Sequence, residues 1–266
     1  MGSFINFKGK NIHFVTAGNG PAMVLLHGFL ESGEIWKNFA RRLSRTFTVI
    51  VIDLPGHGSS DCTGDVQTMD DMAEAVHHVL KSMGITKCIM AGHSMGGYVT
   101  LAFAGKYPKL LRGFVLFHSH AAADSPETMA SRERTISLVE KDRAGFIKNF
   151  IPGLFAPVNV KKFNAEIAIL KELAGKTTKE GIIASIRGMK VRPDRQHVLV
   201  NSPVPVLFII GKNDPRIPVE AIFPQILLPA HSEALLLDQV GHMGFIEAST
   251  QTFEALKGFA GRLFKK

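Results

Sequence analysis

The sequence predicts an α/β protein in which a mostly parallel sheet is flanked by helices and interrupted by a helical insertion. Short, continuously apolar runs such as 22–26 and 47–52 indicate strands buried on both faces, as in parallel sheets. Between these runs, apolar residues recur at helical spacing, for example over 69–83. Strands that alternate with helices in this way are typical of a doubly wound sheet.

Length and composition restrict the class of protein. The 266 residues are 45% hydrophobic and 20% charged, which suits one large globular domain with or without an insertion. The net charge of +8 is dispersed and no nucleic-acid-binding motif is present, so we expect no nucleic-acid partner. No apolar run reaches membrane-spanning length and no leader pattern is seen, so we expect no membrane partner. The oligomeric state stays open.

The two cysteines, Cys62 and Cys88, bear on the compartment. Cys88 falls in a predicted buried strand, so a structural disulfide is not expected. Free thiols are the default in a reducing environment. The sequence therefore predicts a cytoplasmic location.

The elements before residue 120 follow the alternating pattern. In order, we expect a hairpin of strands 4–7 and 11–15, strand 22–26, a helix over 35–43, strand 47–52, helix 69–83, a strand from 88, a helix from 98 to about 107, and strand 114–117. Thr68 and Asp71 form a capping box that starts one of these helices, and Gly84 ends it.

The alternation breaks over 120–200, where helical patterns dominate. These patterns cover 129–139, 144–150, 160–173 and 179–189. Strands return at 204–210 and 234–237, and a helix over 250–264 closes the chain. We therefore expect a core formed by 1–119 and 201–266, with 120–200 inserted as a helical cap.

The most informative motif is Gly-x-Ser-x-Gly, read here as Gly92-His93-Ser94-Met95-Gly96. It joins an apolar strand to a helical pattern, which is the context of a nucleophile elbow. The glycines leave room for a tight turn, and the helix N-terminus directs free N–H groups and a positive dipole end toward an incoming oxyanion. The alternative is a glycine-rich turn with an incidental serine.

A serine nucleophile requires a base and an orienting acid, and both follow later strands. A histidine serves as general base near neutral pH, and an anion on its second nitrogen fixes its tautomer. Ser94, Asp214 and His242 supply nucleophile, acid and base in that chain order. The alternative role of Asp214 is only to cap the helix or turn at 215–218.

Five segments together resemble the α/β-hydrolase-fold serine hydrolases, in their small esterase-like group with a helical cap. They are Leu25-Leu26-His27-Gly28-Phe29, Asp53-Leu54-Pro55-Gly56-His57-Gly58-Ser59, Gly92-His93-Ser94-Met95-Gly96-Gly97, Gly211-Lys212-Asn213-Asp214 and Gly241-His242-Met243. The resemblance implies that the backbone N–H groups of Phe29 and Met95 form the oxyanion hole. It spans nearly the whole core, whereas the cap matches only in type.

Other polar residues near these segments have less direct predictions. We expect His27 to brace the oxyanion loop, His93 to be structural, and Asp53 and His57 to shape the loop after their strand. Some relatives take the acid from the end of the strand before the cap, but no carboxylate occurs there until Asp124.

We expect the substrate pocket to be lined from the cap and the strand ends. The candidate residues are His118, Phe146, Phe150, Phe155, Met189 and Met243. The alternative for the apolar members is packing of the cap on itself and on the core. The alternative for His118 is a place in the hinge into the cap.

No metal or cofactor is expected. The histidines show no pair at metal-binding helical spacing, and neither a phosphate-binding loop nor a dinucleotide fingerprint is present. The sequence thus predicts a serine hydrolase of small carboxylic esters, with a small-molecule ester as its partner. The same triad can cleave thioesters or carbon–carbon bonds or act as a perhydrolase, and a slow-turnover ligand receptor is a further alternative.

Overall fold

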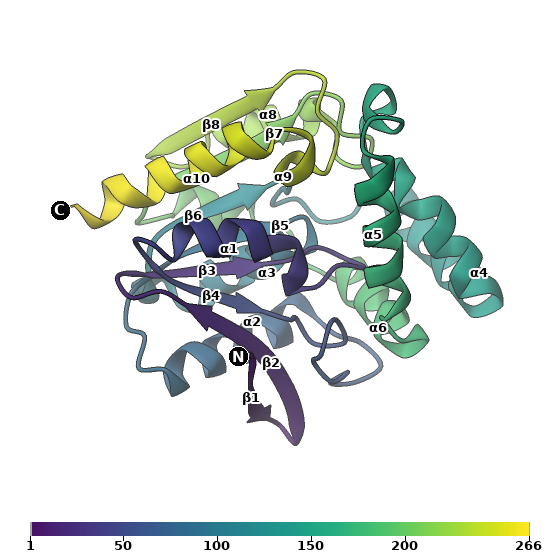
Figure 1. Ribbon diagram of the computed structural model, residues 1–266, viewed down its shortest axis with the longest axis horizontal. Helices are drawn as coiled ribbons and strands as arrows, with labels where there is room; N and C mark the ends of the chain where they lie inside the picture. Colours follow the sequence, from purple (N-terminus) through teal and green to yellow (C-terminus); the bar gives the residue numbers. More distant parts are fainter. Residues whose placement is uncertain (1, 266) are drawn as a thin grey trace.

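The computed structural model describes residues 2–265, and an eight-stranded sheet runs through the middle of the molecule (Figure 1). The strands are β1 (Gly2–Phe7), β2 (Lys10–Ala17), β3 (Ala22–Leu26), β4 (Thr48–Ile52), β5 (Cys88–His93), β6 (Leu111–Phe117), β7 (Val206–Gly211) and β8 (Ser232–Leu237). Their order is β1-β2-β4-β3-β5-β6-β7-β8, and the six strands from β4 to β8 in this order are parallel. The predicted fold class is confirmed.

The central strands of the sheet are buried, whereas the strands at its two edges are partly exposed to solvent. Every residue of β3, β5 and β7 is buried, and these strands are the continuous apolar runs. The hairpin of β1 and β2 is antiparallel, and most of its exposed residues are polar. Polar residues at the edge of a sheet disfavour pairing with another chain. In strand β8, Ser232, Glu233 and Ala234 are exposed, so the opposite edge also faces solvent.

Helices cover both faces of the sheet. The helices of the described residues are α1 (Lys37–Leu43), α2 (Met69–Ser82), α3 (Met95–Lys106), α4 (Pro126–Phe150), α5 (Asn164–Gly175), α6 (Lys179–Lys190), α7 (Gln196–Val200), α8 (Val219–Ile226), α9 (Gly244–Glu247) and α10 (Ser249–Phe264), and those on the sheet faces belong to this set. Figure 1 shows α1 and α10 on the face toward the viewer, with α2 behind the sheet. Thr68 caps α2 by accepting a hydrogen bond from the Asp71 N–H, 3.0 Å away, as the capping box predicts.

Helices α4 to α7 all occur between β6 and β7, and α4, α5 and α6 gather beside the carboxyl ends of the strands (Figure 1). The two predicted helices 129–139 and 144–150 belong to α4, which is interrupted at Asp142 (φ −151°, ψ 84°). Asp142 Oδ1 accepts a hydrogen bond from the Gly145 N–H, 2.9 Å away, in the manner of an N-cap. The second helical run therefore restarts at this residue.

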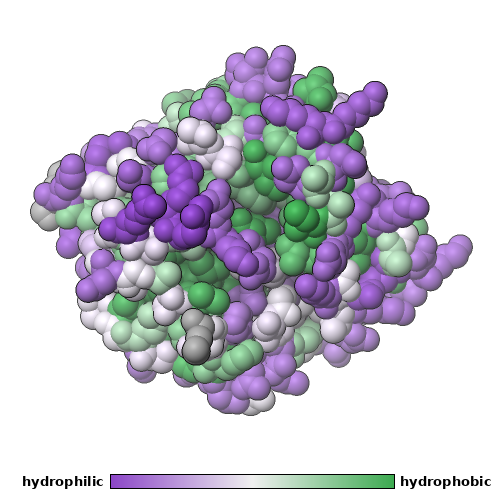
Figure 2. Space-filling model, viewed as in Figure 1, coloured by the Kyte–Doolittle hydropathy of each residue, from purple (hydrophilic) through white to green (hydrophobic). Residues whose placement is uncertain are grey.

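Polar side chains cover much of the face shown in Figure 2, with apolar residues visible among them toward its middle. Within the described residues 2–265, no helix is both long enough and apolar enough to cross a membrane.

Candidate active site

Ser94 occupies the sharp turn between β5 and α3. Its backbone is left-handed, with φ 50° and ψ −114°, a conformation that costs an L-residue about 1–3 kcal/mol. A Cβ at Gly92 would collide with the Gly96 carbonyl, and a Cβ at Gly96 would collide with the His27 carbonyl. The two glycines of the motif are therefore required by the close packing of the turn, and strain concentrates at the serine.

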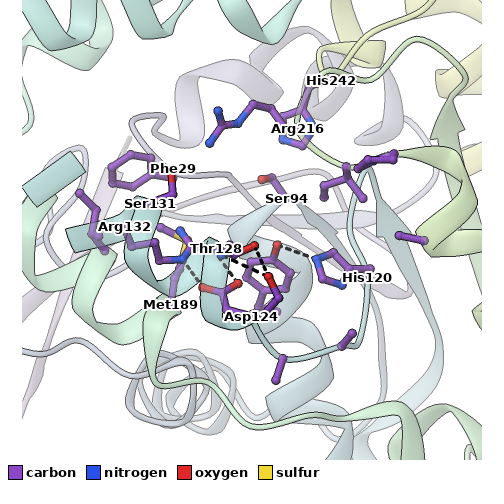
Figure 3. Close-up of a pocket in the computed structure, with 18 of the residues that line it drawn as sticks. Phe29, Ser94, His120, Asp124, Thr128, Ser131, Arg132, Met189, Arg216 and His242 are labelled. Carbon is purple, nitrogen blue, oxygen red and sulfur yellow. Dashed lines mark hydrogen bonds and ion pairs between the residues drawn. The ribbon is translucent and has the colours of Figure 1, made fainter. Parts of the chain in front are cut away.

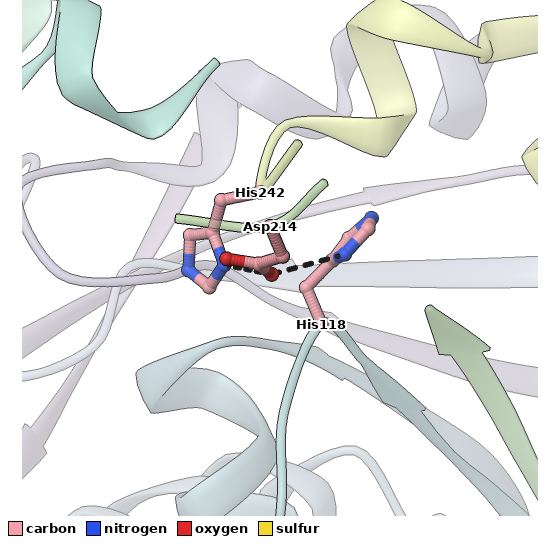
Figure 4. Close-up of side chains that lie close together, drawn as sticks. All are labelled: His118, Asp214 and His242. Atoms are coloured by element: carbon pink, nitrogen blue, oxygen red, sulfur yellow. Dashed lines mark hydrogen bonds and ion pairs between the residues drawn. The ribbon is translucent and has the colours of Figure 1, made fainter. Parts of the chain in front are cut away.

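His242 and Asp214 form a buried hydrogen-bonded pair, with His242 Nδ1 2.7 Å from Asp214 Oδ2 (Figure 4). The other oxygen of Asp214 accepts the backbone N–H groups of Arg216 (2.8 Å) and Ile217 (3.0 Å). Burial alone would raise the pKa of Asp214, but the charges and hydrogen bonds of His242 and His118 lower it well below its usual range. The carboxylate thus caps its turn with one oxygen and contacts the imidazole with the other.

A third side chain, His118, completes this group. It is fully buried at the end of β6, and its Nδ1 lies 3.4 Å from Asp214 Oδ2 (Figure 4). Burial lowers the pKa of His118 to about 4, so the ring is neutral at pH 7. His118, Asp214 and His242 place three ligand-type atoms within 4.8 Å of one another. Because the His242–Asp214 contact has hydrogen-bond length, we describe the group as a hydrogen-bonded cluster rather than a metal centre.

Ser94 and His242 line the same cavity, whose volume is about 360 Å³. Figure 3 shows the Ser94 hydroxyl and the His242 ring on its wall. Within the described residues 2–265 the hydroxyl and the imidazole are not hydrogen-bonded to each other. Catalytic hydrogen bonds are often long in unliganded proteins and tighten when substrate binds.

The loop after β3 carries Phe29, one of the two expected oxyanion donors. The Gly28 N–H donates to Glu31 Oε2 (2.6 Å), and His27 Nδ1 donates to the Gly28 carbonyl (2.8 Å). His27 Nε2 in turn accepts the Leu54 N–H at 2.9 Å. His27 thus contacts both its own loop and the loop after β4, as expected of a bracing residue, and Glu31 adds a further contact to Gly28.

The backbone N–H groups of Phe29 and Met95 have no hydrogen-bond acceptor among the described residues 2–265. Met95 is the first residue of α3, where a helix leaves its N–H groups unpaired. Phe29 and Ser94 both line the cavity.

Sequence reasoning missed Glu31, which forms a buried pair with His93. Glu31 Oε2 lies 2.9 Å from His93 Nδ1, and His93 Nε2 donates to the His242 carbonyl at 2.8 Å. Burial lowers the pKa of His93, but the Glu31 charge and hydrogen bond outweigh it and raise the pKa above 6.5. No motif signals Glu31, because its partner is 62 residues away in the chain.

The remaining loop residues lie as expected of structural groups. Asp53 accepts the N–H groups of Gly33 (2.7 Å) and Ser59 (2.9 Å) and contacts His13. His57 is buried, with Nδ1 3.2 Å from the Pro55 carbonyl.

Two of the six candidate pocket residues, Phe150 and Met189, line the cavity. The other four lie outside its lining. His118 is behind Asp214, Met243 is fully buried, Phe155 packs against Phe163, and Phe146 packs against Phe150. Helical and strand-end position did not distinguish a side chain facing the cavity from its neighbour facing the core.

The cavity wall also carries charged groups that sequence reasoning did not assign to it. Asp124 accepts hydrogen bonds from Arg132, at 3.2 Å for one nitrogen, and it also pairs with Arg192. Arg216 lines the same cavity with its guanidinium carbon 4.9 Å from the centre of the Phe150 ring. Because two guanidinium groups hold Asp124, it is not available to orient His242.

Comparison with known proteins agrees with this architecture. The family model described as alpha/beta hydrolase fold matches residues 21–157, just over half of the chain. A pimeloyl-[acyl-carrier protein] methyl ester esterase of Xanthomonas campestris pv. campestris is 25% identical over 95% of this chain and 100% of its own length. A thermophilic esterase from Thermogutta terrifontis, solved with malate bound, superposes with a TM-score of 0.93 at 29% identity over 99% of both chains.

A third comparison shows the fold alone. The enol-lactonase from Burkholderia xenovorans has a TM-score of 0.89 at 20% identity, over 97% of this chain and 99% of that protein. The matching family model, together with the eight-stranded sheet and the strained serine turn, establishes the class. The chain belongs to the α/β hydrolase fold family.

Proposed function

We propose that this protein is a serine hydrolase that cleaves small carboxylic esters through an acyl-enzyme, with Ser94 as nucleophile, His242 as base and Asp214 as the acid that orients it. The esterase relatives and the family membership support the ester-hydrolase class. One observation supports the roles of these residues. The strained Ser94 and His242 border the same cavity, and His242 Nδ1 contacts the buried carboxylate of Asp214.

The proposed reaction begins with attack of Ser94 Oγ on the ester carbonyl while His242 Nε2 takes the hydroxyl proton. Asp214 accepts a hydrogen bond from the Nδ1–H of His242, which keeps the proton on Nδ1 and leaves Nε2 free to act as the base. The negative charge that develops on the carbonyl oxygen is stabilised by the N–H groups of Phe29 and Met95. One such donor is worth about 3–4 kcal/mol of transition-state stabilisation.

Acylation ends when the ester C–O bond breaks and His242 returns its proton to the leaving alkoxide, so the alcohol departs and the acyl group stays on Ser94. Deacylation repeats these roles with water. The water loses a proton to His242 as it attacks the acyl carbonyl, the bond to Ser94 Oγ breaks, and His242 passes that proton to Ser94 Oγ as the carboxylic acid is released. These steps use only the chain's own groups and water.

We further propose that 120–200 acts as the cap over this site. Support comes from Met189 and Phe150, which lie on inserted helices and border the same cavity as Ser94. The wall also has polar members on α4, of which Thr128 lies near Asp124 and Ser131 near Phe29 in Figure 3. The cap would therefore select the part of the substrate remote from the scissile bond.

A series of p-nitrophenyl esters of increasing acyl length tests the proposal. We expect rapid turnover that depends on acyl length, with a burst of p-nitrophenol when deacylation is slower than acylation. Ser94→Ala should lose about 10⁴-fold or more in turnover while its melting temperature stays close to that of the wild type. The matched control is Ser59→Ala, at an exposed serine outside the cavity lining. Normal turnover by Ser94→Ala would overturn the assignment.

A further inference from the structure

We infer that Arg216 is a specificity residue that binds a free carboxylate at the far end of the substrate, so that the preferred esters are half-esters of dicarboxylic acids. This inference rests on the proposed esterase function and adds the class of acyl group.

The anionic groups on the wall already have partners. Glu31 is paired with His93, and Asp124 is paired with both Arg132 and Arg192. His120 is neutral at pH 7, because burial and then the nearby Arg192 charge lower its pKa to about 4. The protein therefore has no spare carboxylate at this wall to neutralise a further cation.

Arg216 is that further cation. It lines the cavity and has no acidic side chain within ion-pair distance among the described residues 2–265. Figure 3 marks the ion pair of Arg132 with Asp124, whereas the Arg216 guanidinium has no such line. Arg216 lines the cavity and is also exposed to solvent, so an anion can reach its guanidinium. Partial burial and the Arg132 charge lower the pKa of Arg216, and the Asp214 charge opposes this shift. The guanidinium is still a cation at pH 7.

The backbone holds Arg216 in a defined place relative to the reacting groups. Its N–H donates to Asp214 Oδ1 at 2.8 Å, so the residue is fixed to the carboxylate that contacts His242. Its guanidinium carbon lies 4.9 Å from the centre of the Phe150 ring, a cation–π contact that steadies the side chain. Because Arg216 and Ser94 border one cavity, an ester bound at Ser94 can extend its other end to the guanidinium.

A carboxylate suits this position better than a neutral polar group. The planar guanidinium offers paired N–H donors that match the two oxygens of a carboxylate, and charge-assisted hydrogen bonds are about twice as strong as neutral ones. Apolar side chains such as Ile217 and Leu154 share the wall and would contact the methylene chain between the two ends of a half-ester.

The test compares the monoethyl ester of glutaric acid with the matching ester in which a carboxamide replaces the free carboxylate. The wild type should favour the charged ester in kcat/KM. Arg216→Gln should lower kcat/KM for the charged ester by about 10- to 100-fold, mainly through KM, and change that of the amide ester by less than about 2-fold. Arg216→Lys should recover part of the preference because the charge is restored.

The control is Arg134→Gln, an exposed arginine on the same helix as Arg132 but outside the cavity. It removes the same net charge and should leave both substrates unaffected. Equal losses on the two esters in Arg216→Gln, or a wild-type preference for the amide, would overturn the inference.

Binding separates this inference from the proposed function. Calorimetric titration of the half-ester into Ser94→Ala protein measures the anion site without turnover, and Arg216→Gln in that background should weaken binding by a similar factor. If the wild type cleaves neither ester but the half-ester binds through Arg216, the proposed function fails and the anion site stands. If both esters are cleaved equally well and Arg216→Gln does not change the affinity for the half-ester, the inference fails and the esterase function stands.

Discussion

The ring of His93 joins the loop of the proposed base to the loop of the proposed oxyanion hole: its Nε2 lies 2.8 Å from the carbonyl oxygen of His242. Its Nδ1 lies 2.9 Å from Glu31 Oε2, and that same oxygen accepts the Gly28 N–H. Both ring nitrogens face acceptors, which agrees with the raised pKa of His93. The residue beside Ser94 thus contacts both of these loops through its side chain.

Removing the anion of this pair should be costly to stability. Glu31→Gln removes the carboxylate from a fully buried pair and leaves His93 without it, so we expect a loss of about 3–5 kcal/mol in the free energy of unfolding. Urea denaturation at pH 7 measures it. Glu34→Gln, at an exposed neighbour, is the control. An equal, small effect of both substitutions would show that the His93–Glu31 pair does not support the fold.

The role of Asp214 can be isolated by Asp214→Asn, which keeps the shape of the side chain. The amide can donate to His242 Nδ1 and so favours the wrong tautomer, which should lower kcat by about 10⁴-fold. Asp238→Asn, at an exposed loop carboxylate, should have no such effect. Ester hydrolysis rates across pH 6 to 10 measure the change, and near-normal turnover by Asp214→Asn would remove the acid from the proposed triad.

We expect His57 to contribute to the loss of folding stability at acidic pH. Burial lowers its folded-state pKa to about 3, against 6.5 for an unperturbed histidine. Between these values the unfolded chain binds the proton and the folded chain does not, so stability falls as the pH falls from about 6.5. The contribution is about 1.4 kcal/mol per pH unit.

The substitution His57→Gln should therefore flatten the dependence of unfolding free energy on pH by about that slope. Urea denaturation at pH 7, 6 and 5 measures it. The control, His197→Gln, changes an exposed histidine and should leave the slope as in the wild type. An unchanged slope in His57→Gln would mean that His57 is already protonated in the folded protein.

The cysteines should differ in reactivity. Burial raises the pKa of Cys88 to about 12, and its side chain is inaccessible, whereas Cys62 is partly exposed. Because the thiolate is the reactive form, a disulfide reagent at pH 8 should modify one thiol in the native protein and two after denaturation. Cys62→Ser should abolish the native reaction. Rapid native labelling of Cys88 would show that β5 opens readily.

The sequence by itself determined the buried strands, the start of α2 and the tight turn at Ser94, because each depends on residues that are close in the chain. The apolar runs of β3, β4 and β5 are buried on both faces, the capping box starts α2, and glycines flank the serine turn because side chains there would collide with backbone carbonyls. The fold class and the three residues proposed as the triad were predictable for that reason, since each follows a strand and strand ends meet at one edge of a parallel sheet.

Only the tertiary structure decided which side chains meet across the chain. Glu31 pairs with His93, which is 62 residues away in the chain, and Asp124 pairs with Arg192, which is 68 residues away. Arg216 lines the cavity, and no carboxylate among the described residues lies within ion-pair distance of it. Phe146 and Phe150 lie one helical turn apart, yet of the two only Phe150 borders the cavity. Periodicity identifies the apolar face of a helix, but the packing of α4 against α5 and α6 determines which of its side chains border the cavity.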